Sequence, residues 1–283
     1  MKHLLCWCLV LVAGRVLAND LPTFAGPAMG TTYRVILGNE LRGQSLGCVH
    51  REIESVVERL EQAASTWRQH SDISRFNHAI AGDWVPVSKD LIAIVEIAQE
   101  VHLRSGGAFD ITIAPLLRLP ETASIEVREK VLGYVGMEHL SVRTDPPALR
   151  KKKNGVELDV GGIGPGYGVD QIGNRLLELG SVSHVVELGG EIRAWGYQPD
   201  NTYWRIQTRG LRTTSERVLR PGQALAFASS RPGHALIDPR TGHAMQCVHS
   251  VMCVEASTCA EADAEAVASL INSQTKDIEG TQK

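Results

Sequence analysis

The segment Leu158-Asp-Val-Gly-Gly-Ile-Gly-Pro-Gly-Tyr-Gly-Val-Asp170 holds five glycines, at positions 161, 162, 164, 166 and 168. It lies between a predicted strand over Glu157–Val160 and a predicted helix that runs to Gly180. Glycine allows a backbone to approach a ligand closely, and the start of a helix presents free N–H groups and a positive dipole end. The segment therefore suits a phosphate or a pyrophosphate, although a tight strand-to-helix turn would also use glycines.

Two known phosphate-binding loops can be compared with this segment. A P-loop is excluded because no Gly-Lys-Ser/Thr is present. The dinucleotide fingerprint G-x-G-x-x-G fits Gly164 and Gly166, but its third glycine position falls on Val169. Glu187 lies about twenty residues on, where the ribose-binding acid of that fingerprint would stand, yet regular strand–helix alternation is missing. The pattern therefore disfavours a Rossmann fold.

The rest of the chain predicts an α+β fold, with helices mainly in the first half and short strands in the second. The expected helices are Arg51–Ala64, a helix that Ser88 caps and Gly106-Gly107 ends, the helix after the glycine segment, and about Ala260–Ser273. The expected strands are Thr32–Leu37, Glu157–Val160, Val182–Leu188, Trp204–Thr208, Ala224–Ala228 and Ser250–Val254. No repeat or long linker interrupts residues 19–275, which predicts a single domain followed by a polar tail over 276–283.

The first eighteen residues have the pattern of a signal peptide. Lys2 and His3 precede the apolar run Leu4–Ala13, and small residues precede a cleavage site near Ala18. The alternative is an N-terminal core helix or an anchor. We expect an exported protein that is periplasmic after cleavage.

Charge and cysteine content limit the partners and the chemistry. The formal net charge of −3 provides no basic field for nucleic acid, so a phosphate-bearing ligand has to be held locally. Four cysteines remain after the signal segment: Cys48, Cys247, Cys253 and Cys259. They form no CxxC pair and no zinc-type spacing with histidine, and their disulfide pairing stays open.

Two further groups of residues could carry chemistry. The stretch His234-Ala-Leu-Ile-Asp-Pro-Arg-Thr-Gly242 contains a strong turn signature, which is also its purely structural explanation. Asp263 is expected in the first turn of the last helix, where the dipole favours a carboxylate in any case. Each group by itself is weak evidence for a site.

Taken in order, the motifs of this chain cover nearly the whole mature sequence. They are Gly26–Thr31, Ser65–Trp67, Ser71–Asn77, Gly106–Asp110 with Ile111–Pro115, Leu158–Asp170, Leu188–Glu191, His234–Gly242 and Ala262–Ala264. In sequence and in order they resemble the motifs of the ApbE-like family, the FAD:protein FMN transferases.

The resemblance implies a single T-fold-related domain and a defined reaction. Members bind FAD, use a divalent metal, usually Mg²⁺, at its pyrophosphate, and transfer FMN to a threonine or serine hydroxyl of a target protein with release of AMP. The implied partner is an exported or membrane-bound redox protein that accepts flavin.

The resemblance also implies roles for individual residues. Gly162 through its carbonyl and Asp263 through its carboxylate would hold the metal, and Asp263 and His234 would be catalytic. Residues expected to contact FAD are Met29, Trp67, Ala108, Phe109, Asp110, Asp159, Pro165, His234, Ile237 and Asp238.

The chain departs from the family pattern at three places, two of which fall in the reacting site. Val267 stands where the family has a threonine that completes the metal site, and valine cannot ligate. Pro165 replaces a position that is often Lys or Glu, and proline removes one N–H from the loop. The stretch after Pro115 is shortened to Leu116–Pro120. The alternative function is therefore a catalytically degenerate flavin-binding or assembly protein.

Overall fold

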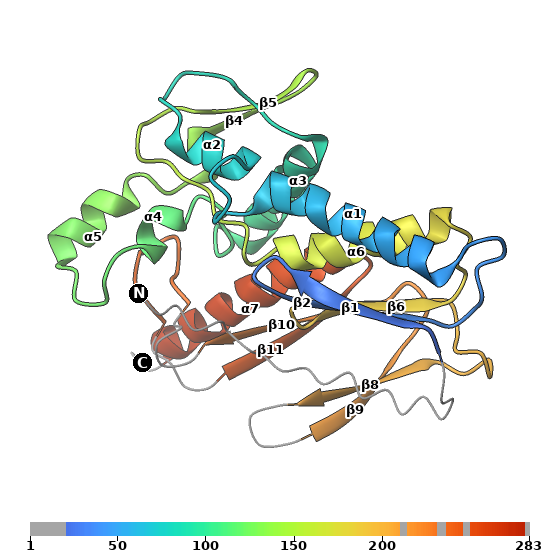
Figure 1. Ribbon diagram of the computed structural model, residues 1–283. Coiled ribbons are helices and arrows are strands. Elements are labelled where there is room, and N and C mark those ends of the chain that lie inside the picture. The colour runs from blue at the N-terminus through green and yellow to red at the C-terminus, as the bar shows by residue number, and fades with distance from the viewer. Residues whose placement is uncertain (1–20, 210–213, 231–235, 246–249, 281–283) are drawn as a thin grey trace. The chain divides into compact units, whose positions relative to one another are not determined.

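The structure, a computed structural model, describes residues 21–209, 214–230, 236–245 and 250–280 (Figure 1). The chain forms two compact units, each assembled from three separated stretches. The first unit comprises residues 1–59, 164–227 and 253–263, and the second comprises residues 60–163, 228–252 and 264–283. Neither unit is thus a contiguous part of the sequence. The predicted signal segment lies outside the described residues.

A six-stranded sheet forms the centre of the first unit. Its order is β1 (Thr23–Ala28), β2 (Thr31–Leu37), β6 (His184–Leu188), β7 (Glu191–Trp195), β10 (Ala224–Ser230) and β11 (Ser250–Ala256). The strands predicted at β2, β6, β10 and β11 are confirmed, and β7 is a further strand that the sequence pattern does not predict. Strand β1 is not predicted from the pattern, because Pro27 argues against a strand. It lies at the edge of the sheet, where proline is tolerated.

Two helices cover one face of this sheet in Figure 1, α1 (Leu46–Ala64) and α6 (Gly164–Glu178). Helix α1 begins five residues before the predicted start because Ser45 caps it, its hydroxyl accepting from the N–H of Cys48 at 3.2 Å. Gly173 allows α6 to approach the sheet, since a Cβ there would lie 2.1 Å from the Trp195 ring. His184 stacks on the same ring at 4.7 Å.

The opposite face of the sheet packs against a two-stranded ribbon, β8 (Trp204–Arg209) and β9 (Thr214–Leu219). Alternate residues of the sheet and the ribbon point into this layer, as the period of a strand requires. The resulting core consists of Ile36, Val185, Ile192, Ala194, Trp204, Ile206, Leu219 and Leu225.

The second unit contains short helices and a three-stranded sheet in the order β3 (Val85–Pro86), β5 (Pro147–Lys151) and β4 (Leu140–Thr144). Its helices are α2 (Asp72–His78), α3 (Lys89–Ser105), α4 (Ala114–Leu117), α5 (Ile125–Leu132) and the 3₁₀ turn η1 (Met137–His139). Both predicted ends of α3 are confirmed: the Ser88 hydroxyl accepts from Leu91 N–H, and Gly106 adopts the left-handed conformation at φ 63°.

The predicted strand over Glu157–Val160 is wrong. Only Glu157 forms a bridge, to Ile113, and the Asp159 N–H donates to the Ile111 carbonyl at 2.8 Å. The other side of the segment faces the side chain of Asn77 instead of a second strand, so no ladder can extend.

The last helix, α7 (Cys259–Gly280), starts one residue before its predicted start and continues past the predicted end at Ser273. No glycine or proline occurs between Ser273 and Gly280, so nothing in the sequence breaks the helix there. Within the described part of the chain, no helix has the length and apolarity that crossing a bilayer would require.

Candidate functional site

The glycine-rich segment is divided between a turn and a helix. Helix α6 begins at Gly164, so Gly164, Gly166 and Gly168 are helical and only Gly161 and Gly162 lie in the turn. Gly166 is required by packing, since a Cβ there would lie 2.3 Å from the Cys259 carbonyl oxygen. Pro165 is in the first turn of α6, where its missing N–H costs the helix no bond. Proline is thus structurally compatible with this position but offers no N–H to a phosphate.

Asp263 points at the start of α6 from the first turns of α7. It is buried, and its Oδ2 accepts from the Gly166 N–H at 3.0 Å. Burial raises the pKa of Asp263 to about 7, while the bond from Gly166 acts in the opposite direction. The Gly166 amide is therefore engaged by the protein's own carboxylate. This corrects, for Gly166, the expectation that the start of this helix presents free N–H groups to a phosphate.

Asp170, whose role the sequence did not reveal, joins the two helices. Its carboxylate accepts from the N–H groups of Cys259 and Ala260 at 2.9–3.0 Å, which caps α7, and it pairs with Arg193 at 2.5 Å. Burial raises the pKa of Asp170, and these three partners oppose that rise. The cap fixes where α7 begins and therefore the position of Asp263 in its second turn.

Met29 lies in the two-residue turn between β1 and β2, with φ 50°, and Gly30 follows with φ 77°. Positive φ at both residues is the signature of a type I′ turn. A Cβ at Gly189, in the β6–β7 turn, would lie 3.1 Å from Thr31 and 3.7 Å from Pro165. The β1–β2 and β6–β7 turns therefore meet the start of α6. Of the predicted site residues, the first unit brings Met29, Pro165 and Asp263 to this region.

The remaining described site residues belong to the second unit. The Asp159 carboxylate accepts from the Gly161 N–H at 2.8 Å and shapes the turn. A Cβ at Gly162 would lie 3.1 Å from Val267 Cγ2 and 3.4 Å from the Phe109 ring. The second unit thus places the predicted carbonyl donor directly beside the residue that replaces the family threonine.

The GGAFD stretch contributes buried groups. Ala108 and Phe109 are buried, and the Asp110 carboxylate accepts from the Thr112 N–H at 2.7 Å and from its hydroxyl at 2.5 Å. His102 Nδ1 lies 3.3 Å from the same carboxylate. Burial raises the pKa of Asp110, and its bonds to Thr112 oppose this. The Asp110 carboxylate therefore holds its own loop together.

Trp67 differs from these residues because 79% of it is exposed. An exposed indole offers a face on which a planar ring can stack. This placement suits the stacking role predicted for Trp67.

Ile237 and Asp238 lie in a tight turn that is closed by the Ile237–Ala244 bridge. The Asp238 carboxylate accepts from Arg240 Nε at 2.9 Å and Nη2 at 2.7 Å. A Cβ at Gly107 would lie 3.4 Å from Arg240 Cγ, so this guanidinium lies beside the GGAFD stretch. Asp238 thus orients Arg240, a cation whose role the Asp-Pro-Arg turn does not reveal by sequence alone. His234 lies outside the described residues.

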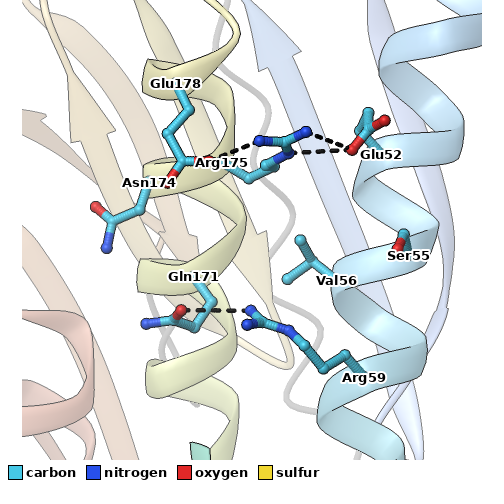
Figure 2. Close-up of a pocket in the computed structure, with 8 residues that line it drawn as sticks. All are labelled: Glu52, Ser55, Val56, Arg59, Gln171, Asn174, Arg175 and Glu178. Atoms are coloured by element: carbon cyan, nitrogen blue, oxygen red, sulfur yellow. Dashed lines mark hydrogen bonds and ion pairs between the residues drawn. The ribbon is translucent and has the colours of Figure 1, made fainter.

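A separate groove of about 350 Å³ lies between α1 and α6, on the first unit (Figure 2). Arg175 donates to Glu52 at 2.8 and 3.0 Å and to Glu178 at 2.7 Å, and Arg59 donates to Gln171 at 3.4 Å. Figure 2 shows Arg175 of α6 turned toward Glu52 of α1, and Arg59 of α1 turned toward Gln171 of α6. Since the charges neutralise each other, the groove is a weaker candidate than the start of α6.

No cluster of three or more His, Cys, Asp or Glu side chains that could hold a metal occurs among the residues that the structure describes.

Comparison with known proteins gives a consistent result. The model of the ApbE family matches residues 29–282. The FAD:protein FMN transferase of Vibrio cholerae is 28% identical over 261 residues, which cover 83% of this chain and 76% of the relative. That of Haemophilus influenzae is 28% identical over 255 residues, covering 79% and 72%.

Solved structures agree in fold. The flavinyl transferase ApbE of Pseudomonas stutzeri, in its apo form, superposes with a TM-score of 0.81 at 29% identity and covers 89% of this chain and 84% of its own. The flavin transferase ApbE of Vibrio cholerae gives 0.81 at 26% identity, covering 89% and 87%. These neighbours confirm the α+β fold class. Because the family model spans most of the sequence, from residue 29 to residue 282, the chain belongs to the ApbE family.

Proposed function

We propose that this chain is an FAD:protein FMN transferase, which transfers FMN from FAD to a threonine or serine hydroxyl of a target redox protein and releases AMP. Family membership supports the reaction class. The observation that carries the proposal within the structure is the buried carboxylate of Asp263, held at the start of α6 by the Gly166 N–H. Burying a carboxylate is energetically unfavourable, and such groups are concentrated at functional sites, so we expect Asp263 to take part in the reaction.

The proposed reaction is a displacement at phosphorus. The acceptor hydroxyl oxygen bonds to the phosphorus of the FMN half, the bond from that phosphorus to the bridging oxygen breaks, and its electron pair leaves with AMP. The hydroxyl proton passes to a base. Asp263 and His234 are the proposed catalytic residues.

The residues present fit Mg²⁺ in the way that this ion is commonly bound, by one or two carboxylates with substrate phosphates and water completing the shell. The proposed protein ligands are the Asp263 carboxylate and the Gly162 carbonyl, which are both hard oxygen donors. A Cβ at Gly162 would meet Val267 Cγ2 at 3.1 Å, so glycine lets this turn lie close to Val267 without displacing its side chain. When bound, Mg²⁺ would neutralise charge on the pyrophosphate.

FAD is proposed to contact the predicted set of residues around these two regions. Trp67 has the exposure that stacking needs, and Met29 lies in a turn beside the start of α6. Asp110 is proposed to fix the shape of its own loop at the flavin site, and Asp238 to orient Arg240.

The proposed setting is the periplasm, with a target that is an exported or membrane-bound redox protein. The signal-peptide pattern of residues 1–18 supports export. The negative net charge supports a protein target and not nucleic acid.

Two observations favour a second candidate, a flavin-binding or assembly protein that has lost transfer. Val267 offers no oxygen beside Gly162, and Pro165 offers no N–H at the start of α6. Such a protein binds FAD with little response to Mg²⁺ and releases no AMP.

The test incubates the protein with FAD, Mg²⁺ and a flavin-accepting subunit of an exported redox complex. The proposal expects a fluorescent, covalently flavinylated band and one AMP per flavin transferred. Asp263→Asn keeps an acceptor for Gly166 but removes the charge, and it should abolish transfer. Glu52→Gln, in the α1–α6 groove, is the control that should transfer normally. FAD binding without a band or AMP would replace the proposal with the second candidate.

A further inference from the structure

Asn77, the penultimate residue of α2, binds the main chain just before the glycine turn. Its Nδ2 donates to the Leu158 carbonyl at 2.9 Å, and its Oδ1 accepts from the Leu158 N–H at 2.7 Å. A side-chain amide that both donates to and accepts from one residue acts as a neighbouring strand would. These two bonds hold Leu158 across 81 residues of sequence.

Lys151 in turn binds the main chain of Asn77. This lysine is buried, with 2% of it exposed, and its Nζ donates to the Asn77 and Val156 carbonyls, each at 2.9 Å. The ammonium also lies 5.2 Å from the centre of the Phe76 ring. Burying an ammonium is costly, so its partners here are specific ones. Lys151 therefore links the end of α2 to the chain that enters the glycine turn.

Main-chain contacts hold the opposite side of this segment. Asp159 donates to the Ile111 carbonyl at 2.8 Å, and Glu157 forms a parallel bridge with Ile113. The stretch 157–159 therefore lies between residues 111–113 on one side and Asn77 on the other.

This stretch leads directly into the turn. Asp159 holds the Gly161 N–H, and Gly162 lies against Val267 and Phe109. A shift of Leu158 would therefore be transmitted over four residues to the Gly162 carbonyl, because the intervening main chain is held by short bonds.

We propose that Asn77 and Lys151 are positioning residues, which set the main chain of residues 158–162 and through it the Gly162 carbonyl and the Asp159 turn. The consequence for catalysis rests on the proposed FMN transfer. The placement of the turn is independent of that proposed function, because it concerns the protein without ligands.

Hydrogen exchange of the ligand-free protein tests the placement. Asn77→Ala removes the bond to the Leu158 N–H, and we expect exchange in the peptide covering residues 158–163 to quicken by about tenfold, as the loss of one main-chain partner implies. Lys151→Met, which keeps the length of the side chain without its donors, should quicken the same peptide to a lesser degree.

The matched control is Asn39→Ala. Asn39 Oδ1 accepts from the N–H groups of Val182 and Ser183, at 3.1 and 2.9 Å, in the first unit. This variant also loses side-chain bonds to main-chain amides, but it should leave exchange at residues 158–163 unchanged. Equal exchange in that peptide for Asn77→Ala, Lys151→Met and wild type would overturn the placement.

Titration with Mg²⁺ and FAD tests the catalytic consequence. We expect Asn77→Ala to need about tenfold more Mg²⁺ for half-maximal AMP release and to lose kcat more than it raises KM for FAD, as changes in groups that orient ligands do. Asn39→Ala should match wild type. If Asn77→Ala does not fold, Lys151→Met carries both measurements.

The outcomes separate the two proposals. A wild-type protein that releases no AMP refutes the proposed function, while the exchange result still decides the placement. A wild-type protein that transfers FMN, together with an Asn77→Ala variant that matches Asn39→Ala in Mg²⁺ requirement and in kcat, refutes the positioning role alone.

Discussion

The substitution Val267→Thr tests the metal site most directly. Val267 is half-buried on α7, and its Cγ2 would lie 3.1 Å from a Cβ at Gly162. Val267 therefore lies close to Gly162, and threonine has the shape of valine. The substitution therefore adds one oxygen beside the predicted carbonyl donor without forcing the turn to move.

Two effects of opposite sign follow. A hydroxyl in a half-buried place costs about 1–3 kcal/mol when it finds no partner. A helical threonine can donate to the carbonyl one turn earlier, so we expect a net loss near the lower end, or a Tm lower by about 2–4 °C. For Mg²⁺, we expect about a tenfold gain in affinity from one added oxygen ligand, which equals about 1.4 kcal/mol.

The assay measures AMP release and FAD binding while Mg²⁺ is titrated. Two matched pairs isolate the oxygen: wild type against Val267→Thr, and Val267→Ala against Val267→Ser. Both hydroxyl variants should reach half-maximal activity at about one tenth of the Mg²⁺ that their partners need. If the members of each pair respond alike to Mg²⁺, the missing oxygen does not limit this site and the reasoning from Val267 is refuted.

Three further predictions concern stability. Gly166→Ala, whose Cβ would meet the Cys259 carbonyl at 2.3 Å, should lower the free energy of unfolding in urea by about 1–3 kcal/mol. Gly47→Ala, whose Cβ would meet Arg51 Nη1 at an ordinary 3.8 Å, should not. Burial raises the pKa of Glu187 to about 7 from 4.5, so the protein loses stability as pH rises from 4.5 to 7. Glu187→Gln should therefore raise the Tm at pH 8, where the gain in free energy of unfolding is at most about 3 kcal/mol, and leave the Tm unchanged at pH 4. Burial lowers the pKa of His184 to about 4 from 6.5, so the free energy of unfolding should fall as pH drops from 6.5 to 4. His184→Phe should reduce this fall. If the variant loses as much stability as wild type over this range, His184 is not the group responsible.

The features that the sequence determined by itself are local ones. Helix α3 shows this well, since Ser88 and Gly106 lie next to the residues that they cap and their effect depends only on nearby main chain. The α+β class follows in the same way from the order of short periodic runs, and the motif order indicates the family.

Tertiary structure decided how the polar groups of the site are used. The Gly166 amide is bound by Asp263, 97 residues later, and Leu158 is bound by Asn77, 81 residues earlier. Neither pairing leaves a periodic trace in the sequence, because a hydrogen bond between distant residues requires only that the fold bring two groups within about 3 Å.

The strand predicted over Glu157–Val160 illustrates the same limit. Its apolar residues alternate as they do in a strand, but a strand also needs neighbouring strands to pair with. Here the segment forms a single bridge on one side and binds the Asn77 side chain on the other. Local preference can propose an extended backbone, and only long-range packing decides what that backbone is paired with.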